Sequence, residues 1–258
     1  MSKIFAIAGV VLKEMFRRKD FYVLFIITVL LSLIMASVNF FNEEKIVRYL
    51  KELSLLLIWI VSLVMAVTSA ARQIPSEREQ RTLFPLLAKP VTRSQVLLGK
   101  FLGCWLSVGG ALLCFYVFFG LLAMTREHEW PIFNYIQAVG LHWMMLGVVI
   151  AFVILGSLVF TAQSSNITIS VILTLGVLVV GRHLNKIALR QAEPGRSITY
   201  TIYYLIPHLE LFDVRDLIVH NWPVIPWNSW ALALAYGAMF AALFMWLACW
   251  VFQKKQVN

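Results

Sequence analysis

Long uncharged runs dominate this sequence and limit how it can fold. Residues 21–41, 53–71 and 101–125 contain no Asp, Glu, Lys or Arg, and the stretch from 130 to 181 contains none either. A bilayer core of about 30 Å requires roughly 20 apolar residues at about 1.5 Å of helical rise each. The composition agrees, because 60% of the residues are hydrophobic and only 14% are charged, whereas soluble domains carry about 25% charged residues. We therefore count membrane spans rather than soluble cores.

Six spans follow from these runs. The stretch from 130 to 181 is too long for one crossing, and the polar sequence at 163–166 divides it in two. We predict spans at 21–41, 53–71, 101–125, 142–162, 167–181 and 230–252. The predicted fold class is an all-α polytopic membrane protein, with one transmembrane domain that covers 1–258.

The N-terminal segment 2–19 is predicted to be an amphipathic helix that enters the first span as an elbow. Its apolar residues Ile4, Ile7, Ala8, Val11 and Met15 recur at helical spacing, with polar residues between them. Such a pattern is typical of a helix that lies along the membrane surface. A secretory signal is disfavoured, because the charged residues that follow this apolar stretch leave no plausible cleavage site.

Basic residues indicate the orientation, since Lys and Arg in short loops stay on the cytoplasmic side. The N-terminal helix, the loop between the second and third spans and the C-terminal tail carry thirteen of the 22 Lys and Arg residues, but only four of the 13 Asp and Glu residues. This face therefore holds the entire net charge of +9. We predict that both termini are cytoplasmic in a bacterial or archaeal plasma membrane, and that the positive charge meets lipid headgroups rather than nucleic acid.

The cytoplasmic loop 72–100 contains signals for local structure. Ser76 with Glu79, and Thr92 with Gln95, have the spacing of a capping box, so each pair can start a helix. The second of these helices is expected to run into the third span.

The segment 76–89 within this loop combines charged residues with a leucine-rich piece that contains Pro85. Two helix caps and several leucines are more than topology needs. We favour a short helix that docks a cytoplasmic partner; the simpler alternative is a basic connecting loop whose charges only set the topology.

The segment 182–229 is expected on the outer side and is too apolar for a simple loop. A Tyr-rich piece precedes Pro207, and apolar residues then alternate with acidic ones up to a Trp- and Pro-rich end. We predict one or two short helices that dip into the outer interface or lie on it, since Trp favours headgroup depth. Two roles stay open here: an outer gate or a platform for an external partner, and a plain interfacial anchor.

Nucleotide-binding and metal-binding motifs are absent from the sequence. Gly99-Lys100 is the only Gly-Lys pair, and it lacks the upstream glycine of a phosphate-binding loop. The cysteines fall within predicted spans, where we expect inert thiols. His208 could join Glu210 and Asp213 around a metal, but a solvated polar helix face explains these residues better.

The predicted spans contain no Asp, Glu, Lys or Arg. Proton- and sodium-driven carriers usually keep such a residue at depth, despite an insertion cost of at least about 2.5 kcal/mol. This argues against an ion-driven carrier and leaves the chain in need of an outside energy source. His142, near the outer end of the fourth span, is expected to hydrogen-bond a neighbour rather than to form a proton relay.

The arrangement resembles the type-2 exporter permeases of ATP-binding cassette (ABC) transporters. The matching residues are Glu77-Arg78-Glu79, Thr82-Leu83, Leu86-Leu87, Pro90-Val91 with Arg93, and Gly99-Lys100. They are similar to the family's pattern of an acidic pair, a Gly-Thr-Leu, a double Leu, Pro-Val-x-Arg and a Gly-Lys that opens the third span. Arg81 stands where the family commonly has glycine. The elbow, the six spans and the long outer segment also match, so the resemblance covers nearly the whole chain.

This resemblance implies a dimer of permease subunits, formed with a second copy or a paralogue, bound to two copies of a separate ATPase subunit. The chain itself would be no enzyme and would bind no cofactor, since ATP and magnesium belong to the ATPase. The implied ATPase-coupling residues are Glu77, Arg78, Glu79, Arg81, Thr82, Leu83, Leu86, Leu87, Pro90 and Arg93. A loop of Gln163, Ser164, Ser165 and Asn166 would make a second, smaller cytoplasmic contact.

ATP-driven closure of the ATPase would then export a substrate or pass force to an external protein, as in the subgroup that serves nitrous oxide reductase maturation. Two other classes stay open at this point. A membrane-embedded maturation factor or enzyme would act through the segment 182–229, and a catalytic cluster facing that side would favour it. A passive channel would be active without any ATPase partner.

Overall fold

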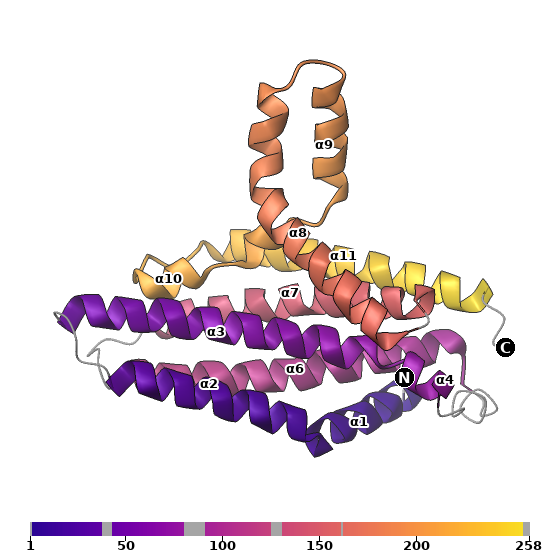
Figure 1. The fold of residues 1–258 in the computed structure, drawn as a ribbon, viewed down its shortest axis with the longest axis horizontal. Helices are drawn as coiled ribbons and strands as arrows, with labels where there is room; N and C mark the ends of the chain where they lie inside the picture. Colours follow the sequence, from indigo (N-terminus) through magenta and orange to yellow (C-terminus); the bar gives the residue numbers. More distant parts are fainter. Residues whose placement is uncertain (1, 38–42, 80–90, 125–130, 161, 255–258) are drawn as a thin grey trace.

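The computed structural model shows a helical protein and describes residues 2–37, 43–79, 91–124, 131–160 and 162–254 (Figure 1). The elements are α1 (Ser2–Arg17), α2 (Lys19–Ser37), α3 (Glu43–Ala71), α4 (Pro75–Glu79), α6 (Arg93–Met124), α7 (Ile132–Val159), α8 (Gln163–Arg190), α9 (Gly195–Leu205), the 3-10 helix η1 (Leu209–Phe212), α10 (Arg215–Val219) and α11 (Trp227–Lys254). These ranges contain no β-strand. The all-α prediction is therefore confirmed for the described residues.

Five helices in the described part are long and apolar enough to cross a membrane, judged by length and composition. They are Arg48–Glu79, Arg93–Met124, Ile132–Val159, Gln163–Gly181 and Trp227–Lys254. The run predicted as the first span, 21–41, begins within α2, whose apolar part Tyr22–Ile34 is shorter than these five. Residues 38–41 of that run lie outside the described residues, so a sixth span stays a prediction.

Two helices begin earlier than the spans predicted within them. The helix expected at 142–162 starts at Ile132, and the one expected at 53–71 starts at Glu43. Polar residues in the first turns of α7 obscured its start in the sequence. Asn134 and Gln137 are buried there and bond to the backbone of residues 217–225, so they extend the helix rather than end it.

The polar sequence 163–166 was predicted as a loop, and this is wrong. Gln163 begins α8, and the chain turns just before it, where Phe160 and Ala162 have extended backbone angles. α8 also continues past 181 to Arg190. Part of the predicted outer segment 182–229 is therefore the end of a long helix.

α3, α6, α7 and α11 run along one axis, and α8 crosses them obliquely (Figure 1). α7 packs against α11, α3 and α6, and α1 packs against α6. The second half of α8 pairs with α9, and this hairpin projects from the bundle. Both chain termini and α4 lie at one end of the bundle, here named the α4 end, whereas α10 lies towards the other, here named the α10 end.

A reciprocal pair of indoles joins α6 to α7. Trp105 Nε1 donates to the carbonyl of Trp143 at 3.0 Å, and Trp143 Nε1 donates to the carbonyl of Trp105 at 3.0 Å. The rings stack with their centroids 4.7 Å apart. Gly147 allows this approach, because a Cβ atom there would lie 2.8 Å from Trp105 Nε1. Both indole N–H groups thus find partners without water, as the membrane interior requires.

The apolar stripe of the N-terminal helix is predicted to lie on the membrane, but in the structure it packs on α6. Ala8, Val11 and Met15 are buried, and a Cβ atom at Gly103 would lie 2.6 Å from Val11 Cβ. The two helix backbones can approach this closely only where α6 lacks a side chain. α1 is therefore part of the bundle and exposes its other faces, which carry Phe5 and Lys13 among others.

Candidate functional site

The predicted coupling residues divide into three groups. Glu77, Arg78 and Glu79 form the end of α4, and Arg93 begins α6. Arg81, Thr82, Leu83, Leu86, Leu87 and Pro90 lie outside the described residues. The described part of the site is thus α4 together with the first turns of α6.

Local hydrogen bonds show how each of these helices begins. The capping box predicted at Ser76 is wrong, because α4 starts at Pro75, and the Ser76 hydroxyl donates back to the carbonyl of Arg72 at 2.6 Å. Proline suits the first helical position, where no N–H is needed. The box predicted at Thr92 is confirmed. The Thr92 N–H donates to Gln95 Oε1 at 3.1 Å, and the Gln95 N–H donates to Thr92 Oγ1 at 3.3 Å.

Lys100 links α4 to α6 through a buried ion pair. Its ammonium lies 2.7 Å from Glu77 Oε1 and donates to the carbonyl of Gln73 at 2.6 Å. Only 5% of the Lys100 side chain is exposed, against 23% for Glu77. A charge taken out of water needs such partners, because desolvation otherwise outweighs its attraction. The ion pair therefore fixes the position of α4 relative to α6.

Lys100 was predicted only from its place in the Gly-Lys pair and among the basic residues of the cytoplasmic loop, and no role was predicted for Gln73. One signal was available: Lys100 is the charge that immediately precedes the uncharged run 101–125. A lysine in that position can reach either to headgroups or back into the protein. Only the position of the preceding helix decides between them.

Arg93 closes the C-terminal end of α11. Its guanidinium donates to the carbonyl of Phe252 at 2.8 Å and lies 5.5 Å from the centroid of the Phe252 ring. Gln253 Nε2 adds a hydrogen bond to Ser94 Oγ at 3.3 Å. The last carbonyls of a helix lack internal partners and carry partial negative charge, which a cation satisfies. Arg93, predicted to touch an ATPase, thus makes its described contacts within the chain.

The second predicted cytoplasmic contact is only partly accessible. Ser164 and Ser165 are exposed and Gln163 is half-buried. Asn166 is fully buried, and its amide donates to the carbonyl of Val153 at 3.2 Å. Asn166 therefore ties α8 to α7, and the first three residues form the surface.

Buried polar side chains at the α10 end hold the chain between α10 and α11. Asn134 Nδ2 donates to the carbonyl of Trp222 at 2.9 Å. Gln137 exchanges two hydrogen bonds with Ile225, of 2.8 and 3.0 Å. Residues 222–226 have no regular structure, so these amides supply partners that the backbone otherwise lacks.

Lys51 also binds this segment from α3. Only 1% of the surface of Lys51 is exposed. Its ammonium donates to the carbonyl of Ile218 at 3.2 Å and to Asn221 Oδ1 at 3.1 Å. Asn221 has a φ of 50°, a left-handed conformation that asparagine tolerates better than most residues. The turn after α10 is therefore anchored by a charge.

His142 links three helices through hydrogen bonds. This confirms the prediction that its side chain bonds to a neighbouring residue. His142 Nε2 lies 2.9 Å from Ser62 Oγ, and Nδ1 lies 3.2 Å from the Tyr116 hydroxyl. The Ser62 hydroxyl donates its one proton to the carbonyl of Trp59 at 3.0 Å, so it must accept from His142. The assigned tautomer then carries its proton on Nε2 and accepts from Tyr116.

The three residues considered as metal ligands do not form one cluster. His208 pairs with Glu210, and Asp213 pairs with Arg215. His208 lies 3.2 Å from Glu210 Oε1, whereas Asp213 binds Arg215 through two bonds of 2.7 and 2.9 Å. The bonds to Asp213 raise the pKa of Arg215 above its ordinary value. No set of three His, Cys, Asp or Glu residues suited to a metal occurs in the described ranges.

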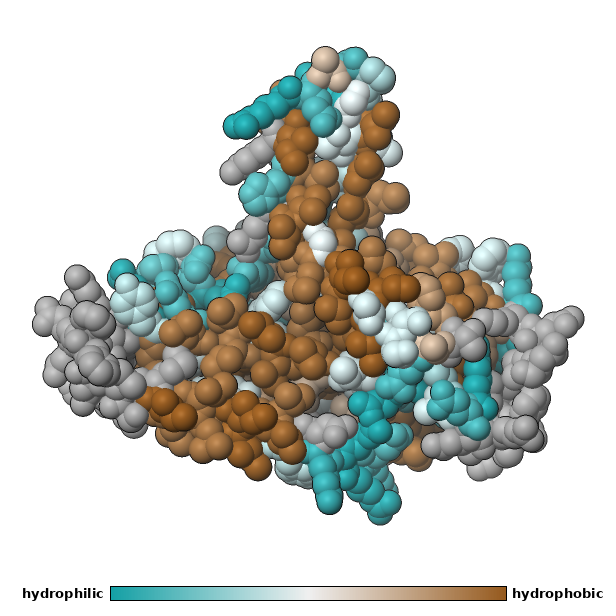
Figure 2. All heavy atoms as spheres, viewed as in Figure 1, coloured by the Kyte–Doolittle hydropathy of each residue, from teal (hydrophilic) through white to brown (hydrophobic). Residues whose placement is uncertain are grey.

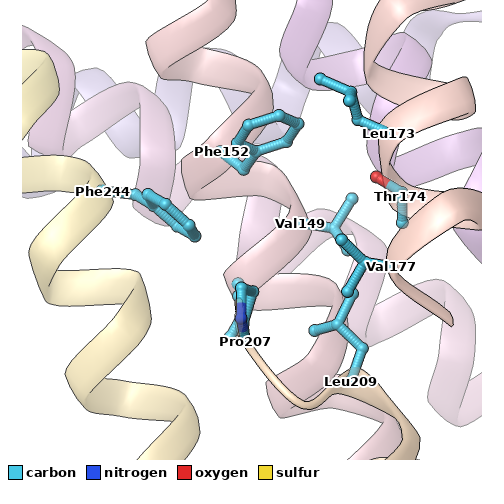
Figure 3. Close-up of a pocket in the computed structure, with 9 residues that line it drawn as sticks. Val149, Phe152, Leu173, Thr174, Val177, Pro207, Leu209 and Phe244 are labelled. Atoms are coloured by element: carbon cyan, nitrogen blue, oxygen red, sulfur yellow. The ribbon is translucent and has the colours of Figure 1, made fainter. Parts of the chain in front are cut away.

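Two apolar pockets lie beside the bundle core. One of about 70 Å³ lies between α7, α8 and α11, and Pro207 and Leu209 also line it (Figure 3). The other, of about 410 Å³, opens between α6, α7 and the start of α11. Its walls include the rings of Tyr116, Tyr135, Trp143 and Trp230. Only the second has the volume that small-molecule sites usually need, roughly 300 Å³ or more.

The profile of the family described as "ABC-2 family transporter protein" matches residues 5–257. Among curated proteins, none matches the sequence.

Proposed function

The chain belongs to the ABC-2 transporter family and is a permease of an ABC transporter, and we propose that it passes the movement of its ATPase through a coupling helix at 76–89. That movement would export a substrate or act on an external protein. Family membership also implies partnership with an ABC ATPase subunit. In the proposed assembly two ATPase copies, which hold ATP and magnesium, bind two permease subunits, the second being a copy or a paralogue.

The position of α4 is the observation that carries this proposal. α4 ends the helix that begins at α3, and Pro75 at its start is buried. Arg78 is half-buried and Glu79 is exposed, so the last turn can meet another protein. The Lys100–Glu77 ion pair holds that turn against the bundle. An element fixed on one side and open on the other can transmit a push.

The proposed orientation places the α4 end in the cytoplasm. Arg78 in α4 and Arg93 and Lys100 in the first turns of α6 lie at this end, which supports the positive-inside assignment. Figure 2 shows apolar surface along the bundle, as expected for a multi-pass membrane protein. We assign the protein to the plasma membrane with both termini cytoplasmic.

The alternative of an enzyme acting through 182–229 has less support. A catalytic cluster on that side would have favoured it, but the acid–base groups considered there form two separate pairs, His208 with Glu210 and Asp213 with Arg215. Coupling to an ATPase accounts for the family match and needs no such cluster.

The decisive experiment purifies the chain from its native host in mild detergent and identifies the ATPase that accompanies it. Glu79→Ala and Leu83→Asp are expected to lower binding of that ATPase by about thirtyfold, the effect of losing an interface hot spot. Glu14→Ala, on the exposed face of α1, serves as the matched control. Normal binding and normal coupling in both variants would show that the coupling helix is misassigned.

A further inference from the structure

The first turns of α6 are a junction for three other elements. α4 is held by Lys100, and the end of α11 is held by Arg93. α1 lies against Gly99 and Gly103, where Cβ atoms would approach Ile7 and Val11 to 2.7 and 2.6 Å. All these contacts fall between residues 93 and 103 of one helix.

These three connections differ in kind. α1 packs through apolar side chains and backbone along a length of helix, and such packing resists sliding because close-packed interiors do not deform continuously. α4 is only five residues long, and the ion pair between Glu77 and Lys100 joins it to α6. That ammonium also binds the Gln73 carbonyl, in the turn between α3 and α4. Lys100 therefore contacts both the turn that leads into α4 and α4 itself.

We propose that Lys100 is the positioning residue that makes α4 and α6 move together, so that displacement of α4 by an ATPase carries α1 and α11 with it. This inference rests on the proposed function. Without the ion pair, α4 stays joined to α3 through the chain but loses its directional contact with α6. A push on α4 would then bend the turn at 72–74 rather than shift the bundle.

The test uses the complex of the full chain with its co-purified ATPase in liposomes, with MgATP as the probe. Lys100→Met and Glu77→Ala are each expected to lower the permease-stimulated kcat for ATP hydrolysis by about three- to thirtyfold. In Lys100→Met the KM for ATP and the amount of bound ATPase should not change, because neither the nucleotide site nor any residue of α4 is altered. Lys13→Met removes an exposed lysine from the same end of the protein and should have no effect.

Exchange of the two charges distinguishes positioning from simple structural support. The double variant Lys100→Glu with Glu77→Lys should recover part of the lost kcat, because the ion pair can form again in reverse although the bond to the Gln73 carbonyl stays lost. If Lys100→Met does not assemble, Glu77→Ala and the double variant still carry the test, since Glu77 is partly exposed.

Three results would overturn the inference. One is full stimulation in both single variants, and another is a loss of ATPase binding in Lys100→Met that matches its loss of kcat. The third is a double variant no better than the worse single one. A wild-type complex without any stimulation would remove the proposed function and this inference together, whereas a stimulated wild type with unaffected variants would remove this inference alone.

Discussion

The two ends of the bundle are held by buried polar side chains in different ways. At the α4 end, Lys100 and Arg93 each fix one helix with a charge. At the α10 end, Asn134 and Gln137 use neutral amides, together with Lys51, to hold a segment without regular structure. Helices satisfy their own backbone, whereas an irregular segment must borrow partners. We infer that polar contacts position helices at the α4 end. At the α10 end they supply the hydrogen bonds that allow a segment without regular structure to pack on the bundle.

The largest expected effect tests the α10 end. Gln137→Leu should destabilise the protein by about 3 kcal/mol, because both the N–H and the carbonyl of Ile225 lose buried partners. Unfolding in mixed detergent micelles would measure this. Ile136→Leu, at a neighbouring exposed position, should stay near the wild type. Equal stability of both variants would contradict the role assigned to the amide.

The next prediction concerns packing at the α4 end. Gly103→Ala should cost about 2 kcal/mol, because the new methyl group meets Val11 and forces α1 away. Gly110 lies in the same helix with nothing within 4 Å of a Cβ atom. Gly110→Ala should therefore stabilise the protein by about 0.5–1 kcal/mol. Unfolding midpoints that shift in the same direction for both variants would argue against the close approach of α1.

Within the bundle, Tyr116→Phe should cost about 1.5 kcal/mol, since His142 Nδ1 then stays buried without a donor. The neighbouring exposed residue Val117 provides the control Val117→Leu. Differential scanning fluorimetry of the two variants would separate them. A neutral result for Tyr116→Phe would contradict the hydrogen bond between Tyr116 and His142, because either tautomer of His142 loses a partner in this variant.

The smallest effect is expected for Arg93→Gln, about 1 kcal/mol, because its site is only half-buried. The cost should shrink at high salt, which screens a charge at a helix end. The cost of Gln137→Leu should not shrink, because its lost bonds are neutral. Similar salt dependence in both variants would erase the distinction between the two ends.

The sequence predicts the helices of this protein well and their interruptions poorly. The uncharged runs identify the long helices, and the Thr92–Gln95 cap is found where its spacing indicates. The start of α7 was missed because Asn134 and Gln137 look like loop residues until their partners are known. The same applies to 163–166, where Asn166 is polar in sequence but buried against α7.

The candidate site shows the same division. Glu77 was selected from a sequence pattern, whereas the residue that binds it, Lys100, was not. Arg93 was selected for an external partner, and the structure shows that it also binds the end of α11, which follows it by more than a hundred residues in the chain. Spacing along one helix can be read locally, but a contact between distant segments cannot.

Composition and periodicity by themselves determined that this chain is helical and belongs in a membrane, because hydrogen-bond satisfaction in a bilayer leaves little choice for long apolar runs. The one-sided distribution of charge likewise gave the predicted orientation without any structure. Tertiary structure alone decided which polar residues are buried and what they hold. Lys51, Lys100 and Asn166 read as boundary or loop residues in the sequence, yet each is buried against a distant segment, because a polar group leaves water only when packing brings it a partner.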